Sequence, residues 1–203
     1  MEIDIKILLV GASGTIGQAV EAILKANHEV ISANYANGDV KVDLGNPDSI
    51  RNMFEVVGHV DAVISTAGVA AFAGFDDLTD KDYQTALNNK LMGQINLLRL
   101  GKPFISEGGS ITLTSGVLSR EPMHGSAVIS MANGALESFV KAAALEVDNF
   151  RVNVVAPVFV KETMAMMGME TESGLSADDT AKAYIAAVTG RMHGQTLDAP
   201  DYL

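Results

Sequence analysis

The stretch "IKILLVGASGTIG", residues 5–17, decides the fold. It begins as a continuous apolar run, passes through a glycine-containing turn and then takes up the pattern of a helix. A short run that is apolar at every position is typical of a strand buried on both faces of a parallel sheet. The stretch therefore predicts the first strand, a tight turn and the first helix of an α/β fold.

Apolar strands and helical segments alternate along the rest of the chain. Further strands are expected in "ANHEVISAN" (26–34), "HVDAVISTAG" (59–68), "GSITLTSG" (109–116), "RVNVVAP" (151–157) and "GQTLDAP" (194–200). Such alternation implies right-handed crossovers and a doubly wound parallel sheet with helices on both faces, as in a Rossmann fold. No linker, repeat or low-complexity segment interrupts it, so we expect one domain over residues 1–203.

The three glycines of the opening turn have the spacing and the placement of a dinucleotide-binding turn. Gly11 permits a tight turn, Gly14 lets the backbone approach a pyrophosphate, and Gly17 lets the helix pack close to the strand. The N-terminus of that helix offers free N–H groups and a partial positive charge to phosphates. The alternative, glycines that serve only a tight connection, is weakened by their position between the first strand and the first helix.

The end of the second strand leaves the choice between NAD and NADP open. An acidic residue at this corner binds the ribose hydroxyls of NAD, whereas an arginine favours the 2′-phosphate of NADP. This chain has Ala33 and Asn34 there, and Asn34 is able to form a hydrogen bond with a ribose.

Composition excludes several other classes of protein. The net charge is −11 without a Lys/Arg cluster, which argues against nucleic acid and anionic membranes as partners. There is no cysteine, and the four histidines are scattered, so no metal site is expected. The N-terminus is acidic and its apolar run is too short to span a bilayer, and we therefore expect a cytoplasmic protein.

Several motifs in this order resemble the short-chain dehydrogenase/reductase (SDR) superfamily. The resemblance rests on the glycine turn, Asp43 in "VDL", "STAG" (65–68), "ITLTSG" with Ser115, "RVNVVAP" and "GQTLDAP". It implies an NAD(P)-dependent oxidoreductase that acts on a small carbonyl or alcohol substrate. It also implies that Gly11, Ser13, Gly14, Ile16 and Gly17 hold the cofactor, with Asp43, Ala67 and Gly68 at its adenosine side.

One departure from the family pattern concerns the proton donor. SDR enzymes usually carry Tyr-x-x-x-Lys on the helix after the serine strand. The landmark "AALE" (143–146) places these two positions on Ile129 and Asn133, and none of the four tyrosines has a lysine four residues later. Loss of a general acid typically lowers a rate by roughly 10² to 10⁴, while positioning and hydride donation survive.

Four residues are candidates for the remaining chemistry. The resemblance assigns Ser115 to polarising a carbonyl. Counting back from Gly93 places the position of the family's structural asparagine on Lys90. Lysine and asparagine would then have exchanged positions, with Lys90 where the family has Asn and Asn133 where it has Lys. The alternative is that Lys90 is a solvated helix lysine and that the alignment is wrong by one residue. His124 lies in the loop before the site helix, and its pKa range suits a substitute acid, although a loop histidine is more often simply exposed.

Two functions from different classes follow. The first is an SDR-like oxidoreductase with a replaced proton relay, and the second is a catalytically inactive sensor or scaffold that binds a dinucleotide. The helix at 127–146 has a face of small residues, which permits close approach of another helix. In the family this helix contributes to subunit contacts, so the resemblance implies a homodimer or homotetramer.

Overall fold

The computed structural model describes residues 4–203 and contains one seven-stranded sheet in which every neighbouring pair of strands is parallel. The strand order is β3-β2-β1-β4-β5-β6-β7. The strands are β1 (Lys6–Val10), β2 (Glu29–Asn34), β3 (Val40–Lys41), β4 (Val60–Ser65), β5 (Ile105–Thr114), β6 (Arg151–Ala156) and β7 (Thr196–Asp198). The doubly wound parallel sheet that the alternating pattern predicts is therefore confirmed.

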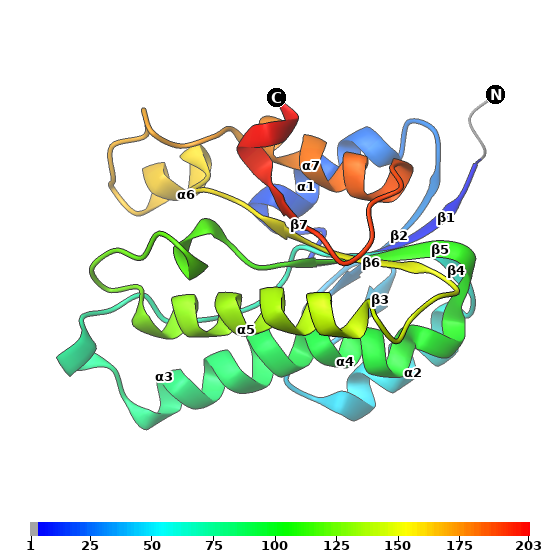
Figure 1. Cartoon of the computed structure of the whole chain (residues 1–203), viewed down its shortest axis with the longest axis horizontal. Helices are drawn as coiled ribbons and strands as arrows, with labels where there is room; N and C mark the ends of the chain where they lie inside the picture. The colour runs from blue at the N-terminus through cyan, green and yellow to red at the C-terminus, as the bar shows by residue number, and fades with distance from the viewer. Residues whose placement is uncertain (1–3) are drawn as a thin grey trace.

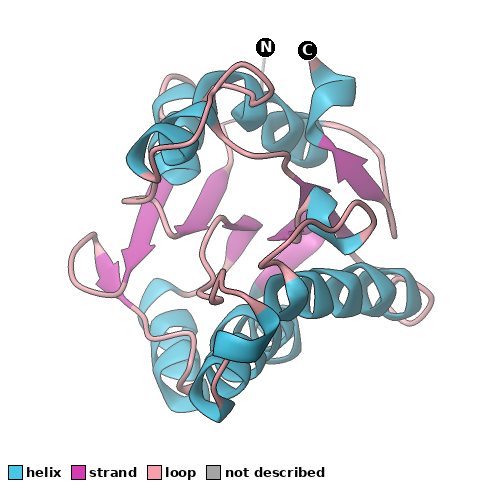
Figure 2. Ribbon diagram, turned by 90° about the vertical axis from the view of Figure 1, so that its left-hand side faces the viewer, coloured by secondary structure: helices cyan, strands magenta, loops and turns pink. Residues whose placement is uncertain are grey.

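Helices cover both faces of the sheet (Figures 1 and 2). The helices are α1 (Thr15–Leu24), α2 (Pro47–Val57), α3 (Asp80–Thr85), α4 (Met92–Gly101), α5 (Ala127–Ala143), α6 (Lys161–Met166) and α7 (Ala177–Thr189). Two clusters of buried apolar side chains lie between the layers. One joins the sheet to α2, α4 and α5, and the other joins it to α1 and α7.

The long helical stretch predicted before β5 is not uniform. Between α3 and α4 the chain forms a π-helical turn, η2 (Ala86–Leu91), which inserts one extra residue per turn into the helix. Such turns occur mostly as short insertions in α-helices and often at functional sites. Short 3-10 turns occur at η1 (Phe75–Asp77), η3 (Lys102–Phe104), η4 (Val117–Ser119) and η5 (Ala199–Tyr202).

All strands run in the same direction, so their carboxyl ends meet at one edge of the sheet. At that edge β1 lies between β2 and β4, and the connections from β1 and β4 leave toward opposite faces. In open α/β sheets, ligands bind in the crevice at such a point. None of the helices among residues 4–203 has the length and apolar character that crossing a membrane requires.

Candidate functional site

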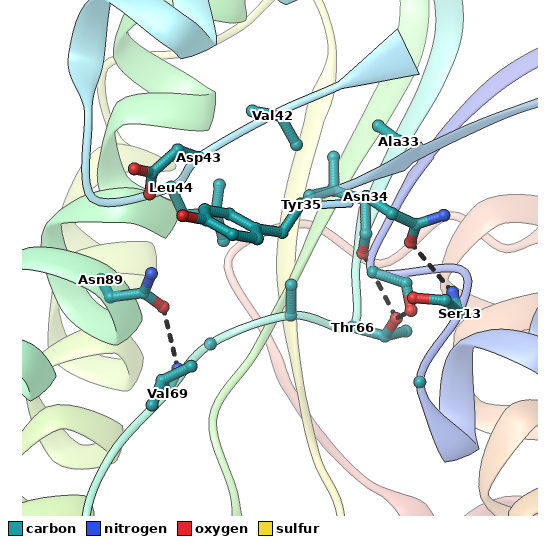
Figure 3. Close-up of a pocket in the computed structure, with 15 residues that line it drawn as sticks. Ser13, Ala33, Asn34, Tyr35, Val42, Asp43, Leu44, Thr66, Val69 and Asn89 are labelled. Atoms are coloured by element: carbon teal, nitrogen blue, oxygen red, sulfur yellow. Dashed lines mark hydrogen bonds between the residues drawn. The ribbon is translucent and has the colours of Figure 1, made fainter. Parts of the chain in front are cut away.

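A cavity of about 430 Å³ opens at the carboxyl edge of β1, β2 and β4 (Figure 3). This volume lies within the range that small-molecule and cofactor sites occupy. Four segments and one helix residue contribute to its wall: Val10, Gly11, Ser13 and Gly14; Ala33, Asn34 and Tyr35; Val42, Asp43 and Leu44; Thr66, Ala67, Gly68 and Val69; and Asn89. The wall carries one charged side chain, Asp43.

The glycine turn forms one end of this cavity. Gly11 has a φ of +89°, a conformation that side chains rarely adopt, and its N–H donates to the Ala33 carbonyl at 2.8 Å. A Cβ on Gly17 would lie 2.0 Å from the Gly11 carbonyl oxygen, so only glycine allows α1 to begin this close to the turn. Gly14 is the N-cap of α1 and provides no side chain to its first N–H groups. Those groups are therefore available to an anion.

Polar contacts tie the end of β2 to the glycine turn and shape the rest of the cavity. The Ser13 N–H donates to Asn34 Oδ1 at 2.9 Å, so the acceptor atom of this amide faces the glycine turn. Asp43 Oδ1 accepts from the Gly45 N–H at 2.8 Å, and Tyr35 stands in the opening with 77% of its surface exposed. Figure 3 shows the Tyr35 ring between Leu44 and Asn34. The end of β2 therefore presents neither a carboxylate nor a cation to the cavity.

Most of the residues predicted to hold a cofactor surround this cavity. Gly11, Ser13, Gly14, Asn34, Asp43, Ala67 and Gly68 line it. Gly17 supports the turn from behind, and Ile16 packs against the core cluster under α1 instead of facing the cavity. The sequence reading missed Tyr35, which directly follows Asn34, and Asn89, whose Oδ1 accepts from the Val69 N–H at 2.9 Å. Asn89 lies 20 positions from its partner along the chain, so no local pattern points to it.

None of the four predicted catalytic residues lines this cavity, and two of them, Ser115 and Asn133, lie beside the end of β5. Ser115 directly follows β5, and its hydroxyl donates to Glu137 Oε1 on α5 at 3.0 Å. Glu137 is buried and also accepts from the Ser119 hydroxyl at 2.6 Å, while Arg120 Nε lies 3.4 Å from its second oxygen. Arg120 in turn pairs with Asp198 at the end of β7. The Ser115 proton thus points toward a carboxylate that the sequence reading did not identify.

Asn133 lies beside the residue that follows Ser115. Its side chain is buried, and Nδ2 donates to the Gly116 carbonyl at 3.4 Å. Its Oδ1 is enclosed and has no hydrogen-bond partner among the described residues. A buried amide oxygen without a partner is uncommon, because its desolvation is not compensated. Ile129 lies one helical turn before Asn133 and is only partly buried.

Lys90 occupies the π-helical turn η2 and is 6% exposed. The alternative reading of a solvated lysine is therefore wrong. A Cβ placed on Gly68 would lie 3.1 Å from Lys90 Cγ, so the lysine stem runs beside a residue of the cavity wall. Burial lowers the pKa of Lys90 from 10.5 to about 8, because the charged form loses its hydration.

His124 and Tyr184 differ in their access to this region. His124 is exposed in the loop before α5, with its imidazole beside Gly74. Tyr184 is fully buried in the core cluster of α1 and α7, and its hydroxyl lies 2.6 Å from Thr114 Oγ1. Burial raises the pKa of Tyr184. Its partner Thr114 directly precedes Ser115, but Tyr184 packs on the opposite face of the sheet from α5, so it does not replace the missing phenol.

Comparison with known proteins identifies the family of this chain. Residues 5–192 match the family model described as Enoyl-(Acyl carrier protein) reductase. The chain belongs to the short-chain dehydrogenase/reductase superfamily. Among SDR relatives, versicolorin reductase stcU of Emericella nidulans is 29% identical over 80% of this chain and 72% of its own length. An uncharacterized oxidoreductase of Methylorubrum extorquens is 28% identical over 84% of this chain and 80% of its own length.

Solved structures of similar proteins superimpose over nearly the whole chain. The protein lin1944 from Listeria innocua is 40% identical, with a TM-score of 0.91, over 95% of this chain and 98% of that one. A small-chain dehydrogenase in complex with NADPH is 27% identical, with a TM-score of 0.85, over 97% of this chain and 96% of that one. The SDR assignment made from the motifs is therefore confirmed.

Proposed function

We propose that this protein binds NAD or NADP and transfers hydride to or from a small carbonyl or alcohol substrate. The observation that carries the proposal is the cavity at the carboxyl edge of β1, β2 and β4, with an uncapped helix N-terminus at one end. Membership of the SDR superfamily and the NADPH complex of a 27% identical dehydrogenase support it. When bound, the nicotinamide of the cofactor supplies or accepts the hydride.

The residues of the cavity fit a dinucleotide. The pyrophosphate would lie on the N–H groups that begin α1, with Gly11, Ser13, Gly14, Ile16 and Gly17 shaping that turn. Asn34, Asp43, Ala67 and Gly68 would surround the adenosine. The ribose corner lacks both the carboxylate that selects NAD and the arginine that selects NADP, so we expect the affinities for the two cofactors to differ by less than about tenfold.

Four side chains would act on the substrate. Ser115 would polarise the carbonyl, which requires its proton to turn away from Glu137. Asn133 would position a group through its unpartnered oxygen, and Lys90 would place an ammonium at the same edge. His124 would lie nearer the entrance because its loop is exposed. None of these roles requires a metal, and residues 4–203 contain no cluster of three metal-ligating side chains.

A second candidate function is binding of the dinucleotide without turnover, as in a sensor or scaffold. Two observations favour it: an isoleucine stands at the position of the usual phenol, and the Ser115 proton is held by a buried carboxylate. Under this alternative the cavity and its glycine turn still bind the dinucleotide, but the residues at the end of β5 do not support hydride transfer to or from a substrate.

One experiment distinguishes the two functions. NADH and NADPH are titrated separately against the purified protein by calorimetry, and absorbance at the nicotinamide band is then followed with aldehydes, ketones and quinones. We expect both cofactors to bind, and at least one carbonyl to be reduced at a rate that Ser115→Ala lowers by roughly tenfold or more. Binding without any turnover would support the sensor, and absence of binding would contradict both functions.

We further propose that the protein is a homodimer or homotetramer in which α4 and α5 form the contact. Met92 on α4 and Met131 on α5 are exposed, and α5 carries the small residues Ala127 and Ser138 on its exposed surface. Apolar and small side chains on neighbouring helices permit close packing of a second copy.

A further inference from the structure

A buried ammonium without a partner needs an explanation. Lys90 is 6% exposed, and among residues 4–203 it takes part in no ion pair. Burying a charge is unfavourable unless the charge is paired, and proteins rarely retain such a group for stability alone. Lysines in this condition are frequent acid–base groups, because burial brings their titration close to neutral pH.

Backbone contacts place Lys90 at the carboxyl ends of β4 and β5. The Gln94 side-chain amide donates to the Lys90 carbonyl at 3.1 Å and to the Thr114 carbonyl at 2.8 Å. Gln94 Oε1 also accepts from the Thr114 N–H at 2.7 Å, so one buried amide ties η2 to the residue before Ser115. The Cβ and Cγ atoms of Lys90 lie beside Gly68, which follows β4 in the chain. Lys90 therefore lies beside Gly68 of the cavity wall, on a turn that Gln94 ties to the last residue of β5.

The charged groups on neighbouring elements do not compensate this ammonium. Elements α3, α4 and α5 pack against η2. Their titratable groups are Asp80, Lys81, Asp82, Tyr83, Arg99, Glu137 and Lys141. Asp82 is bound to Thr79, and Glu137 is bound to Ser115 and Ser119. Burial is the one cause of the lowered pKa of Lys90, which falls to about 8.

We propose that Lys90 is the proton donor and acceptor of the reaction, in place of the missing tyrosine. This inference rests on the proposed oxidoreductase function. In reduction, the oxygen that becomes an alkoxide takes a proton from Lys90 Nζ: the new O–H bond forms, the N–H bond breaks, and a neutral amine remains. Water then returns the proton to the amine. In oxidation the neutral amine accepts the alcohol proton.

The other candidates suit this step less well. An isoleucine at position 129 has no proton to exchange, and the Asn133 amide does not titrate. Tyr184 is enclosed in the opposite layer of the fold, and His124 lies in an exposed loop beside Gly74. Lys90 is the one of these residues that combines a titratable proton with burial beside the end of β5 on the face of the sheet that α5 covers.

The first test measures titration and does not depend on turnover. Protein labelled with ¹³C at lysine Cε is titrated by NMR, and the Lys90 resonance is identified by its loss in Lys90→Met. We expect its midpoint about two pH units below those of the exposed lysines, and a change of its chemical shift on saturation with NADPH. A Lys90 titration midpoint equal to those of the exposed lysines would overturn the inference. A chemical shift of the Lys90 resonance that does not change on addition of NADPH would also overturn it.

The second test measures catalysis with the carbonyl compound that the wild type reduces fastest among the aldehydes, ketones and quinones. Lys90→Met should bind NADPH within about threefold of the wild type but reduce the carbonyl roughly 10²- to 10⁴-fold more slowly. The wild-type rate of reduction should fall as the pH rises past about 8, and the variant should lose this dependence. Lys81→Met, which removes an exposed lysine of α3, is the matched control and should behave as wild type.

The outcomes separate this inference from the proposed function. A wild type that does not bind either cofactor refutes the proposed function itself. If the wild type reduces the carbonyl and Lys90→Met reduces it at the same rate, the role of Lys90 is refuted. The proposed oxidoreductase function is then unaffected. A wild type that binds without turnover refutes the role of Lys90 and supports the sensor. Rescue of Lys90→Ala by added ethylamine would support proton transfer by Lys90 over a structural role.

Discussion

Replacing Gly17 with alanine is expected to lower the free energy of unfolding by about 3 kcal/mol or more. The added Cβ would lie 2.0 Å from the Gly11 carbonyl oxygen and 2.8 Å from Ala12 Cα, and both are backbone atoms that cannot rotate away. Helix α1 would have to move from β1 and from the turn that begins it. Because the chain has no tryptophan, unfolding in urea is best followed by circular dichroism.

Gly14→Ala is the matched variant from the same turn. Its Cβ would lie 3.4 Å from the Gly11 carbonyl oxygen, which is an ordinary contact, so we expect a change in unfolding free energy below about 1 kcal/mol. Gly14 lines the cavity, however, and its new methyl group would stand where a pyrophosphate approaches. NADPH affinity should fall at least about tenfold. An unchanged affinity would contradict the placement of the pyrophosphate at this turn.

Replacing Lys90 with methionine is expected to stabilise the protein by roughly 3 kcal/mol at pH 7. Burial lowers the pKa of Lys90 from 10.5 to about 8, and each unit of such a shift corresponds to about 1.4 kcal/mol. Methionine keeps the length of the stem and removes the charge. If Lys90 is retained for chemistry at a cost in stability, the variant is more stable and less active, as is common at functional sites.

The pH dependence of this effect has a definite sign. Between about pH 8 and 10.5 the unfolded chain binds the Lys90 proton and the folded protein does not. The stability contribution of Lys90 therefore rises with pH through this window, and the advantage of the variant shrinks from its full value below pH 8 to nearly zero above 10.5. Urea unfolding of wild type, Lys90→Met and Lys81→Met at several pH values measures it. A constant difference between wild type and Lys90→Met would contradict the burial of an ammonium.

The sequence was sufficient for the main layers of the fold because strand segments rich in apolar residues alternate with helical segments along the chain. It was not sufficient for β3, whose two residues are too few to show a pattern, or for η2. A π-helical turn depends on how Lys90, Gln94 and Thr114 meet in the folded protein. The helical periodicity of residues 80–101 continues across it without an obvious break.

The residues of the candidate site also fall into those that the sequence predicts and those that only the structure shows. Gly11, Gly14 and Asn34 could be predicted because the apolar pattern predicts β1 and β2 and the turns that follow them, whereas Asp43 was predicted from the resemblance of "VDL" to the family motif. The hydrogen bond between Ser115 and Glu137 could not be predicted from the sequence, because it joins the side chains of two residues that are 22 positions apart. The burial of Lys90 also depends on tertiary packing, and only the structure separates it from a solvated helix lysine.

The most direct measurement of the central claim is a crystal structure of the protein saturated with NADPH. We predict the pyrophosphate on the N–H groups that begin α1, the adenine between Asp43 and Ala67, and the nicotinamide at the ends of β4 and β5 with Lys90 Nζ directed toward it. A nucleotide bound at any other edge of the sheet, or an N-terminus of α1 without phosphate at saturating concentration, would contradict the account.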